Sequence, residues 1–146
     1  MAVGSSGRPT ILIVDDDEGL RDSLHLIIYE EYQVVEAGDG VQALTMLGTR
    51  RIDLVLLDLL MSRADGFEVL ERRSETQKMI PIVVLSGLNT AWTAATAARL
   101  GAVDYITKPF DEEILLSVVR GAITSAGKLR RLARVGPSHV LLVGVG

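Results

Sequence analysis

The chain has 146 residues, 48% of them hydrophobic, and a net charge of −4 at pH 7, which suits one domain with a sizeable core. The absence of cysteine excludes disulfides and thiolate metal sites, and the acidic balance argues against nucleic-acid binding, because phosphate contacts need a basic face. No apolar run approaches the ~20 residues of a membrane span and no secretory signal is recognisable, so we expect a cytoplasmic protein that does not bind membranes.

Short apolar runs alternate along the chain with segments of helical periodicity. Residues 1–8 are small and polar and predict a flexible lead-in. The predicted strands lie at 10–14, 32–36, 52–57, 80–85 and 102–106, and the predicted helices at about 17–29, 41–48, 65–77, 89–100 and from 111 to beyond 126. This alternation with short connections predicts a parallel sheet with helices on both faces.

The chain lacks the glycine-rich loops that cradle nucleotides. The first strand–helix turn does not read G-x-G-x-x-G, and G-x-x-x-x-G-K-[ST] occurs nowhere. Of the two common doubly wound orders, five strands without that fingerprint favour 2-1-3-4-5. We therefore predict an α/β fold of the flavodoxin-like type, with a doubly wound five-stranded parallel sheet.

The C-terminal part of the chain predicts an extension of the last helix. Apolar residues repeat there at alternating spacings of four and three, as in a helical pairing surface: Leu115, Val119, Ala122, Ala126, Leu129 and Ala133. Basic residues follow near the helix end, where cations are favoured: Lys128, Arg130, Arg131 and Arg134. Residues 137–146 read like the first strand, so we expect 127–146 to be a helix extension or linker leading into the start of a truncated further domain.

Four of the predicted strands end at residues that carry chemistry. The first strand stops at Asp15 and Asp16, the third at Asp58, the fourth at Ser86, and the fifth just before Lys108. Open α/β sheets bind their ligands outside the carboxyl ends of their strands. We therefore expect three carboxylates, a hydroxyl and an ammonium to meet at one edge of the sheet.

Three carboxylates at one edge repel one another, because two unit charges ~4 Å apart cost about 4 kcal/mol at an effective dielectric of 20. A hard divalent cation, above all Mg²⁺, relieves this repulsion and prefers oxygen ligands. A carboxylate such as Asp58, held beside Mg²⁺ and the ammonium of Lys108, is equipped to attack phosphorus and form an acyl phosphate. Ser86 and the backbone amides after Asp58 can donate to the phosphoryl oxygens.

With these residues in order, about residues 9–126 resemble the receiver domain of two-component response regulators. The matching segments are Ile11–Asp17 with Arg21, Glu36–Gly40 with Ala43 and Leu44, Asp53–Asp58, Asp65 and Gly66, Val84–Gly87, and Gly101–Phe110. The resemblance implies that Asp58 accepts a phosphoryl group from a histidine kinase or phosphotransfer protein. It also implies that Asp15 and Asp16 serve Mg²⁺, with Asp16 the more direct ligand, and that the backbone carbonyl of Leu60 completes the ligand set.

The resemblance further implies a switch. Ser86 would move toward the phosphoryl group and Tyr105 would turn inward, changing the surface formed by the fourth helix, the fifth strand and the fifth helix. Such a domain catalyses only its own phosphorylation and slow dephosphorylation, and is not an enzyme acting on a separate substrate. A homodimer through that surface is a further expectation.

The chain departs from the family pattern in the loop after the acceptor. Met61 is followed by Ser62 where the family usually has proline, and Ala64 replaces a frequent methionine, but neither change removes a ligand. Leu60 and Leu88 stand where the family's side chains flank the approach of hydrolytic water. Because leucine neither orients nor activates water, we predict a long-lived phosphoryl state.

Several alternatives stay open. A degenerate receiver would act only as an interaction or dimerisation module, and a Mg²⁺-dependent phosphohydrolase would want an acid where this chain has Leu60. Asp17 is better explained as a helix cap than as a ligand. Trp92 is either a partner contact or packing, and neither His25 nor His139 is a credible phosphodonor.

Overall fold

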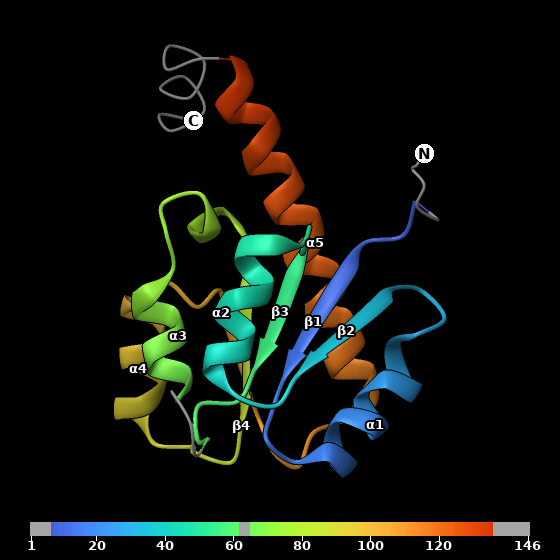
Figure 1. The fold of residues 1–146 in the computed structure, drawn as a ribbon, viewed down its shortest axis with the longest axis vertical. Helices are drawn as coiled ribbons and strands as arrows, with labels where there is room; N and C mark the ends of the chain where they lie inside the picture. The colour runs from blue at the N-terminus through green and yellow to red at the C-terminus, as the bar shows by residue number, and fades with distance from the viewer. Residues whose placement is uncertain (1–6, 62–64, 136–146) are drawn as a thin grey trace.

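The protein is described by a computed structural model that covers residues 7–61 and 65–135, with side chains up to Lys128. Five strands form one parallel sheet in the order β2-β1-β3-β4-β5, which confirms the predicted order (Figure 1). The strands are β1 Thr10–Val14, β2 Gln33–Ala37, β3 Leu54–Leu57, β4 Ile82–Ser86 and β5 Asp104–Thr107. The helices are α1 Glu18–Ile28, α2 Gly40–Thr49, α3 Gly66–Arg72, α4 Ala91–Arg99 and α5 Glu112–Val135, with a 3₁₀ turn, η1, at Gln77–Met79.

Two apolar layers cover the two faces of the sheet, as the uninterrupted apolar strands predict. Leu12 and Val55 point into one layer together with apolar residues of α2, α3 and α4. Ile11 and Leu54, their neighbours in the chain, point into the opposite layer together with residues of α1 and α5. Every residue of β1 after Thr10, and all of β3 and β4, is buried, which leaves only the strand ends for chemistry.

Each of the first four α-helices begins at a side chain that accepts a hydrogen bond from the backbone N–H of the third helical residue. These caps are Asp17, Asp39, Asp65 and Thr90. The bond satisfies an amide that the first turn leaves without a partner. The predicted capping role of Asp17 is therefore confirmed.

The third helix is shorter than predicted. It ends at Arg72, not near Gln77, because Arg73 adopts an extended backbone conformation (φ −61°, ψ 138°). The buried guanidinium of Arg73 donates to three carbonyls, those of Leu70, Ile80 and Leu100. Helical periodicity could not indicate this ending, since the acceptor on Leu100 lies 27 residues further along the chain.

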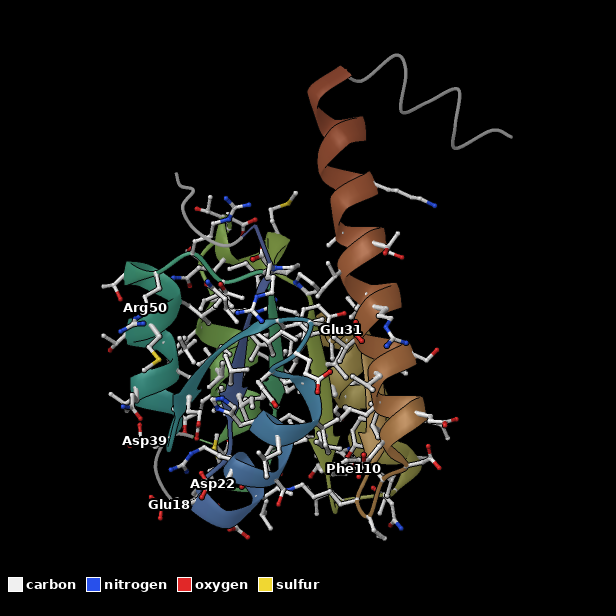
Figure 2. The ribbon with its side chains drawn as sticks, turned by 90° about the vertical axis from the view of Figure 1, so that its right-hand side faces the viewer. Glu18, Asp22, Glu31, Asp39, Arg50 and Phe110 are labelled. Carbon is white, nitrogen blue, oxygen red and sulfur yellow. The ribbon has the colours of Figure 1, made fainter. Side chains whose placement is uncertain are left out.

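The last helix continues past Ala126, as predicted. It runs 24 residues to Val135 and projects well beyond the sheet (Figures 1 and 2). Leu115, Val119 and Ala126 are buried against the domain. The structure does not describe the side chains beyond Lys128, which include the predicted seam positions Leu129 and Ala133 and the basic residues 130, 131 and 134. The tail 136–146 lies outside the described residues. None of the helices among the described residues combines the length and the apolar composition of a membrane span.

Candidate functional site

The ends of β1 and β3 bring Asp15 and Asp58 side by side. Val14 pairs with Leu57 in the parallel register, and the Asp58 N–H continues this ladder by donating to the Val14 carbonyl at 2.9 Å. Asp15 and Asp58, which follow these last strand residues, therefore lie next to each other at the same edge of the sheet. Both acids are nearly buried, with relative exposures of 3% for Asp15 and 7% for Asp58.

Asp16 completes an acidic cluster at this edge. Carboxylate oxygens of Asp15, Asp16 and Asp58 all lie within 4.8 Å of one another, and Asp16 is the exposed member. Asp17, by contrast, is directed to its own helix, where its Oδ1 accepts from the Leu20 N–H at 3.2 Å. The structure thus brings together the three predicted carboxylates and separates the fourth acid from them.

Lys108 faces this cluster from the end of β5. Its Nζ lies 2.8 Å from Asp15 Oδ2 and 3.5 Å from Asp58 Oδ2. The Lys108 N–H donates to the Ser86 carbonyl at 2.9 Å, which anchors its backbone to β4. One ammonium therefore opposes two nearly buried carboxylates, and the group as a whole retains an excess of negative charge.

Burial raises the pKa of Asp58 above its ordinary value. The Leu60 N–H, the Lys108 ammonium and the Ser86 hydroxyl act in the opposite direction, whereas the neighbouring Asp15 charge raises the pKa further. Loss of hydration thus outweighs the nearby hydrogen bonds and positive charge. A cation bound beside Asp58 would favour its ionised, nucleophilic form.

The loop after Asp58 is shaped by one close approach. The Leu60 N–H donates to Asp58 Oδ1 at 3.2 Å, and the Gly66 N–H donates to the Leu59 carbonyl at 3.1 Å. A Cβ on Gly66 would lie 2.5 Å from the Asp58 carbonyl oxygen and 2.7 Å from Leu59 Cα. The Asp65-Gly66 pair therefore caps α3 and lets that helix begin directly against the backbone of Asp58.

Ser86 and Tyr105 are linked through one residue, Leu88. Ser86 is fully buried, and its Oγ accepts from the Leu88 N–H at 3.3 Å. The Tyr105 hydroxyl donates to the Leu88 carbonyl, and its half-buried ring packs on the layer that holds α4. A continuous path therefore leads from the edge that carries Asp58 to the surface of β5.

Arg21 belongs to one of the segments that match the receiver family, but the sequence gives it no role in the site. Its Nη1 donates to the Asp15 main-chain carbonyl at 2.6 Å, and its Nε donates to Glu36 Oε1 at 3.1 Å. The available signal was its position four residues after the Asp17 cap, which places it one turn above the acidic loop. That spacing does not reveal Glu36, which lies on another element.

Trp92 and His25 are not members of the acidic cluster. Trp92 is 67% exposed, and its ring lies 6.3 Å from that of Phe67. It therefore packs against a neighbouring ring and is also accessible from solvent, so both interpretations drawn from the sequence stay open. His25 has its Nδ1 3.3 Å from Glu36 Oε2, and His139 lies outside the described residues.

Comparison with known proteins decides the family. Residues 11–120 match the family described as "Response regulator receiver domain". The chain belongs to this family. The response regulator MprA of Mycobacterium sp. (strain KMS) is 39% identical to this receiver domain over 114 residues, which are 77% of this chain and 50% of that protein. The corresponding protein of Mycobacterium bovis (strain BCG / Pasteur 1173P2) has the same identity and coverage.

Solved receiver structures share the fold. A CheY-like receiver domain protein from Methanospirillum hungatei JF-1 superposes with a TM-score of 0.79 at 26% identity, over 84% of this chain and 98% of that one. NtrX from Brucella abortus superposes with a TM-score of 0.82 at 32% identity, over 89% of this chain and 30% of its own. The receiver chain spans about half the length of the curated relatives it matches. The flavodoxin-like receiver fold is therefore confirmed, as is membership of the two-component response regulators.

Proposed function

We propose that Asp58 is the phosphoacceptor of this receiver domain and takes its phosphoryl group from a histidine kinase or a phosphotransfer protein. The observation that carries the proposal is the placement of Lys108 opposite Asp15 and Asp58, within 2.8 Å and 3.5 Å of their carboxylates. An isolated helix cap or structural ion pair would not need three acids and a lysine from three strand ends.

The proposed transfer forms one bond and breaks another. An Asp58 Oδ attacks the phosphorus of a phosphohistidine, the phosphorus–nitrogen bond breaks, and its electron pair stays on the imidazole, leaving an acyl phosphate on Asp58. Lys108, the Ser86 hydroxyl and the backbone amides after Asp58 would donate to the phosphoryl oxygens. The domain thus acts on itself and not on a separate substrate.

The acidic cluster fits Mg²⁺, because its donors are all oxygens and lie within 4.8 Å of one another. Asp16 is the exposed member, whereas both Asp15 oxygens accept hydrogen bonds, from the Asp17 N–H and from Lys108. Asp58 lies between these cases, since its Oδ1 accepts from the Leu60 N–H and its Oδ2 faces Lys108 at 3.5 Å. Asp16 would therefore hold the ion most directly, with Asp58 beside it and Asp15 in support, and the Leu60 carbonyl would complete the ligand set that the family resemblance implies. When bound, the ion would supply positive charge for the carboxylates and the incoming phosphoryl oxygens.

The path from Ser86 through Leu88 to Tyr105 supports a switch at the surface of α4, β5 and α5. Movement of Ser86 toward a phosphoryl group would disturb the hydrogen bond that its Oγ accepts from Leu88. The Leu88 carbonyl holds the Tyr105 hydroxyl, so the same disturbance would reach β5. Exposed Val103 and Ile114 lie next to β5 and at the start of α5, and a second copy docking there is part of the proposal.

Labelling by radioactive acetyl phosphate tests the acceptor. The wild type should incorporate phosphate in the presence of MgCl₂ and lose the incorporation with chelator. D58N should remain unlabelled, whereas D104N, which alters an exposed aspartate at the start of β5, should label normally. A wild-type protein that never labels would be a degenerate receiver, and labelling of D58N equal to wild type would place the acceptor elsewhere.

A further inference from the structure

Arg21 joins the acidic loop to β2. Its side chain is only 16% exposed, and its backbone N–H donates to the Asp17 carbonyl within the first turn of α1. The side chain turns back toward the N-terminus of that helix, where Nη1 reaches the Asp15 carbonyl at 2.6 Å and Nε reaches Glu36 at 3.1 Å. Gly38 lies beside the guanidinium, where a Cβ would make an ordinary van der Waals contact with Nη1 at 3.6 Å.

Asp15 is held at each of its polar groups. Its N–H donates to the Ala37 carbonyl at 3.1 Å, Oδ1 accepts from the Asp17 N–H at 2.9 Å, and Oδ2 accepts from Lys108 at 2.8 Å. Arg21 supplies the remaining contact, to the carbonyl of the peptide that connects Asp15 with Asp16. The peptide whose carbonyl Arg21 binds also carries the backbone N–H of Asp16.

We propose that Arg21 is a positioning residue for the cation site: its guanidinium fixes the Asp15–Asp16 peptide, and Glu36 fixes the guanidinium. This inference rests on the proposed function of the acidic cluster. Three carboxylates repel one another when no cation is bound, so the loop that carries two of them needs a restraint that does not itself use a carboxylate of the cluster. A bond to the main-chain carbonyl is such a restraint.

Glu36 makes the arrangement specific for arginine. It binds the guanidinium through Oε1, while its Oε2 lies 3.3 Å from His25 Nδ1, so its own position is set from two sides. Arginine can donate in two directions from one rigid plane, whereas a lysine ammonium is a point charge on a flexible stem. Lysine at position 21 would keep the positive charge but would not hold both acceptors in the same geometry.

The simpler interpretation is an ordinary ion pair between α1 and β2, which would contribute only modestly to stability. That role and the proposed one differ in what a substitution changes. A purely structural ion pair, when removed, lowers the unfolding temperature and leaves the affinity of the folded domain for Mg²⁺ unchanged. A positioning residue, when removed, weakens Mg²⁺ binding in the folded domain.

The test is a titration of the whole chain with MgCl₂, followed through the backbone amide signals of the acidic loop by NMR. R21Q should raise the Kd for Mg²⁺ by about tenfold, the lower end of what is lost with groups that orient metal ligands. R21K should also raise the Kd, and E36Q should raise it by less, since the bond to Asp15 survives.

R120Q is the matched control. It breaks an exposed arginine–glutamate pair, Arg120 with Glu31, that joins α5 to the end of α1 and touches no residue of the acidic cluster. Its Mg²⁺ affinity should equal that of the wild type. An unchanged Kd for Mg²⁺ in R21Q would overturn the proposal. A raised Kd in R21Q together with an unchanged Kd in R21K would assign the effect to charge and would also overturn positioning. If R21Q does not fold, the Kd values of R21K and E36Q provide the test. A wild-type protein that binds Mg²⁺ but never incorporates phosphate would contradict the proposed function. The Mg²⁺ titrations would still show whether Arg21 affects the affinity of the acidic cluster for the ion.

Discussion

The carboxyl of Asp58 connects site chemistry with stability at the scale of one residue. Because burial raises its folded-state pKa, the free energy of unfolding is highest while the group is protonated and falls as the pH rises through the folded pKa. We expect D58N without divalent cations to melt at a higher temperature than the wild type at pH 7. The difference in melting temperature between D58N and the wild type should disappear at pH values below the ordinary aspartate pKa of 3.8. Thermal unfolding followed by circular dichroism across this pH range checks it, and equal melting temperatures at pH 7 would contradict it.

The side chain of Leu60 should affect how long the phosphoryl group stays on Asp58. Its side chain is 66% exposed and follows Asp58 by two residues, where it offers water neither a donor nor an acceptor. Label on the wild type should therefore persist for minutes, and L60N should speed its loss by roughly tenfold, below the ~10²-fold that a positioned general base contributes.

The matched control for this lifetime is L26N, which changes a leucine on α1 that is 72% exposed. It should leave the rate of label loss unaltered. Decay of the wild-type label within seconds would show that hydrolytic water reaches Asp58 without help from this position.

At the scale of elements, the start of α3 depends on Gly66. A Cβ there would press on the backbone of Asp58 and Leu59, neither of which is a flexible side-chain end that could move aside. We expect G66A to destabilise the fold by about 1–3 kcal/mol, the usual cost of overpacking, as measured by urea unfolding. G121A is the contrast, since a Cβ on this α5 glycine meets nothing within 4 Å, and it should stabilise by up to ~1 kcal/mol through helix propensity.

Arg73 joins three elements at the opposite edge of the sheet. Its guanidinium donates to carbonyls of Leu70, Ile80 and Leu100, which belong to the ends of α3 and α4 and the entry to β4. R73M would fill similar space but leave these carbonyls without that donor, so we expect a loss of about 1–3 kcal/mol. R99M, on the exposed end of α4, should cost much less, and equal urea midpoints for the two variants would argue against the role of Arg73.

At the scale of the whole molecule, the surface of α4, β5 and α5 is the proposed output. Beryllofluoride, a mimic of the phosphoryl group, should act through the path from Ser86 to Tyr105 and shift the sedimentation of the wild type toward a dimer. D58N should not respond, because the mimic needs the acceptor carboxylate. Identical sedimentation of the wild type with and without beryllofluoride would count against dimerisation through this surface.

Much of the architecture follows from local sequence. Short, uninterrupted apolar runs rich in branched side chains, such as Leu54–Leu57, favour strands covered on both faces, and their alternation with amphipathic segments predicts a doubly wound parallel sheet. Because the carboxyl ends of parallel strands share an edge, the residues after each run predict the meeting of Asp15, Asp58 and Lys108. The acidic cluster was therefore predictable from order along the chain alone.

Only the tertiary structure decided features whose partners lie on other elements. The early end of α3 depends on Arg73 and a carbonyl 27 residues away, and the restraint on Asp15 depends on Arg21 held by Glu36, 15 residues further on. Helical and strand periodicities report which face of an element is apolar, and they carry no information about which backbone carbonyl a long polar side chain will reach. The sequence by itself thus determined the sheet and the acids at its edge, whereas packing between elements decided how those acids are held.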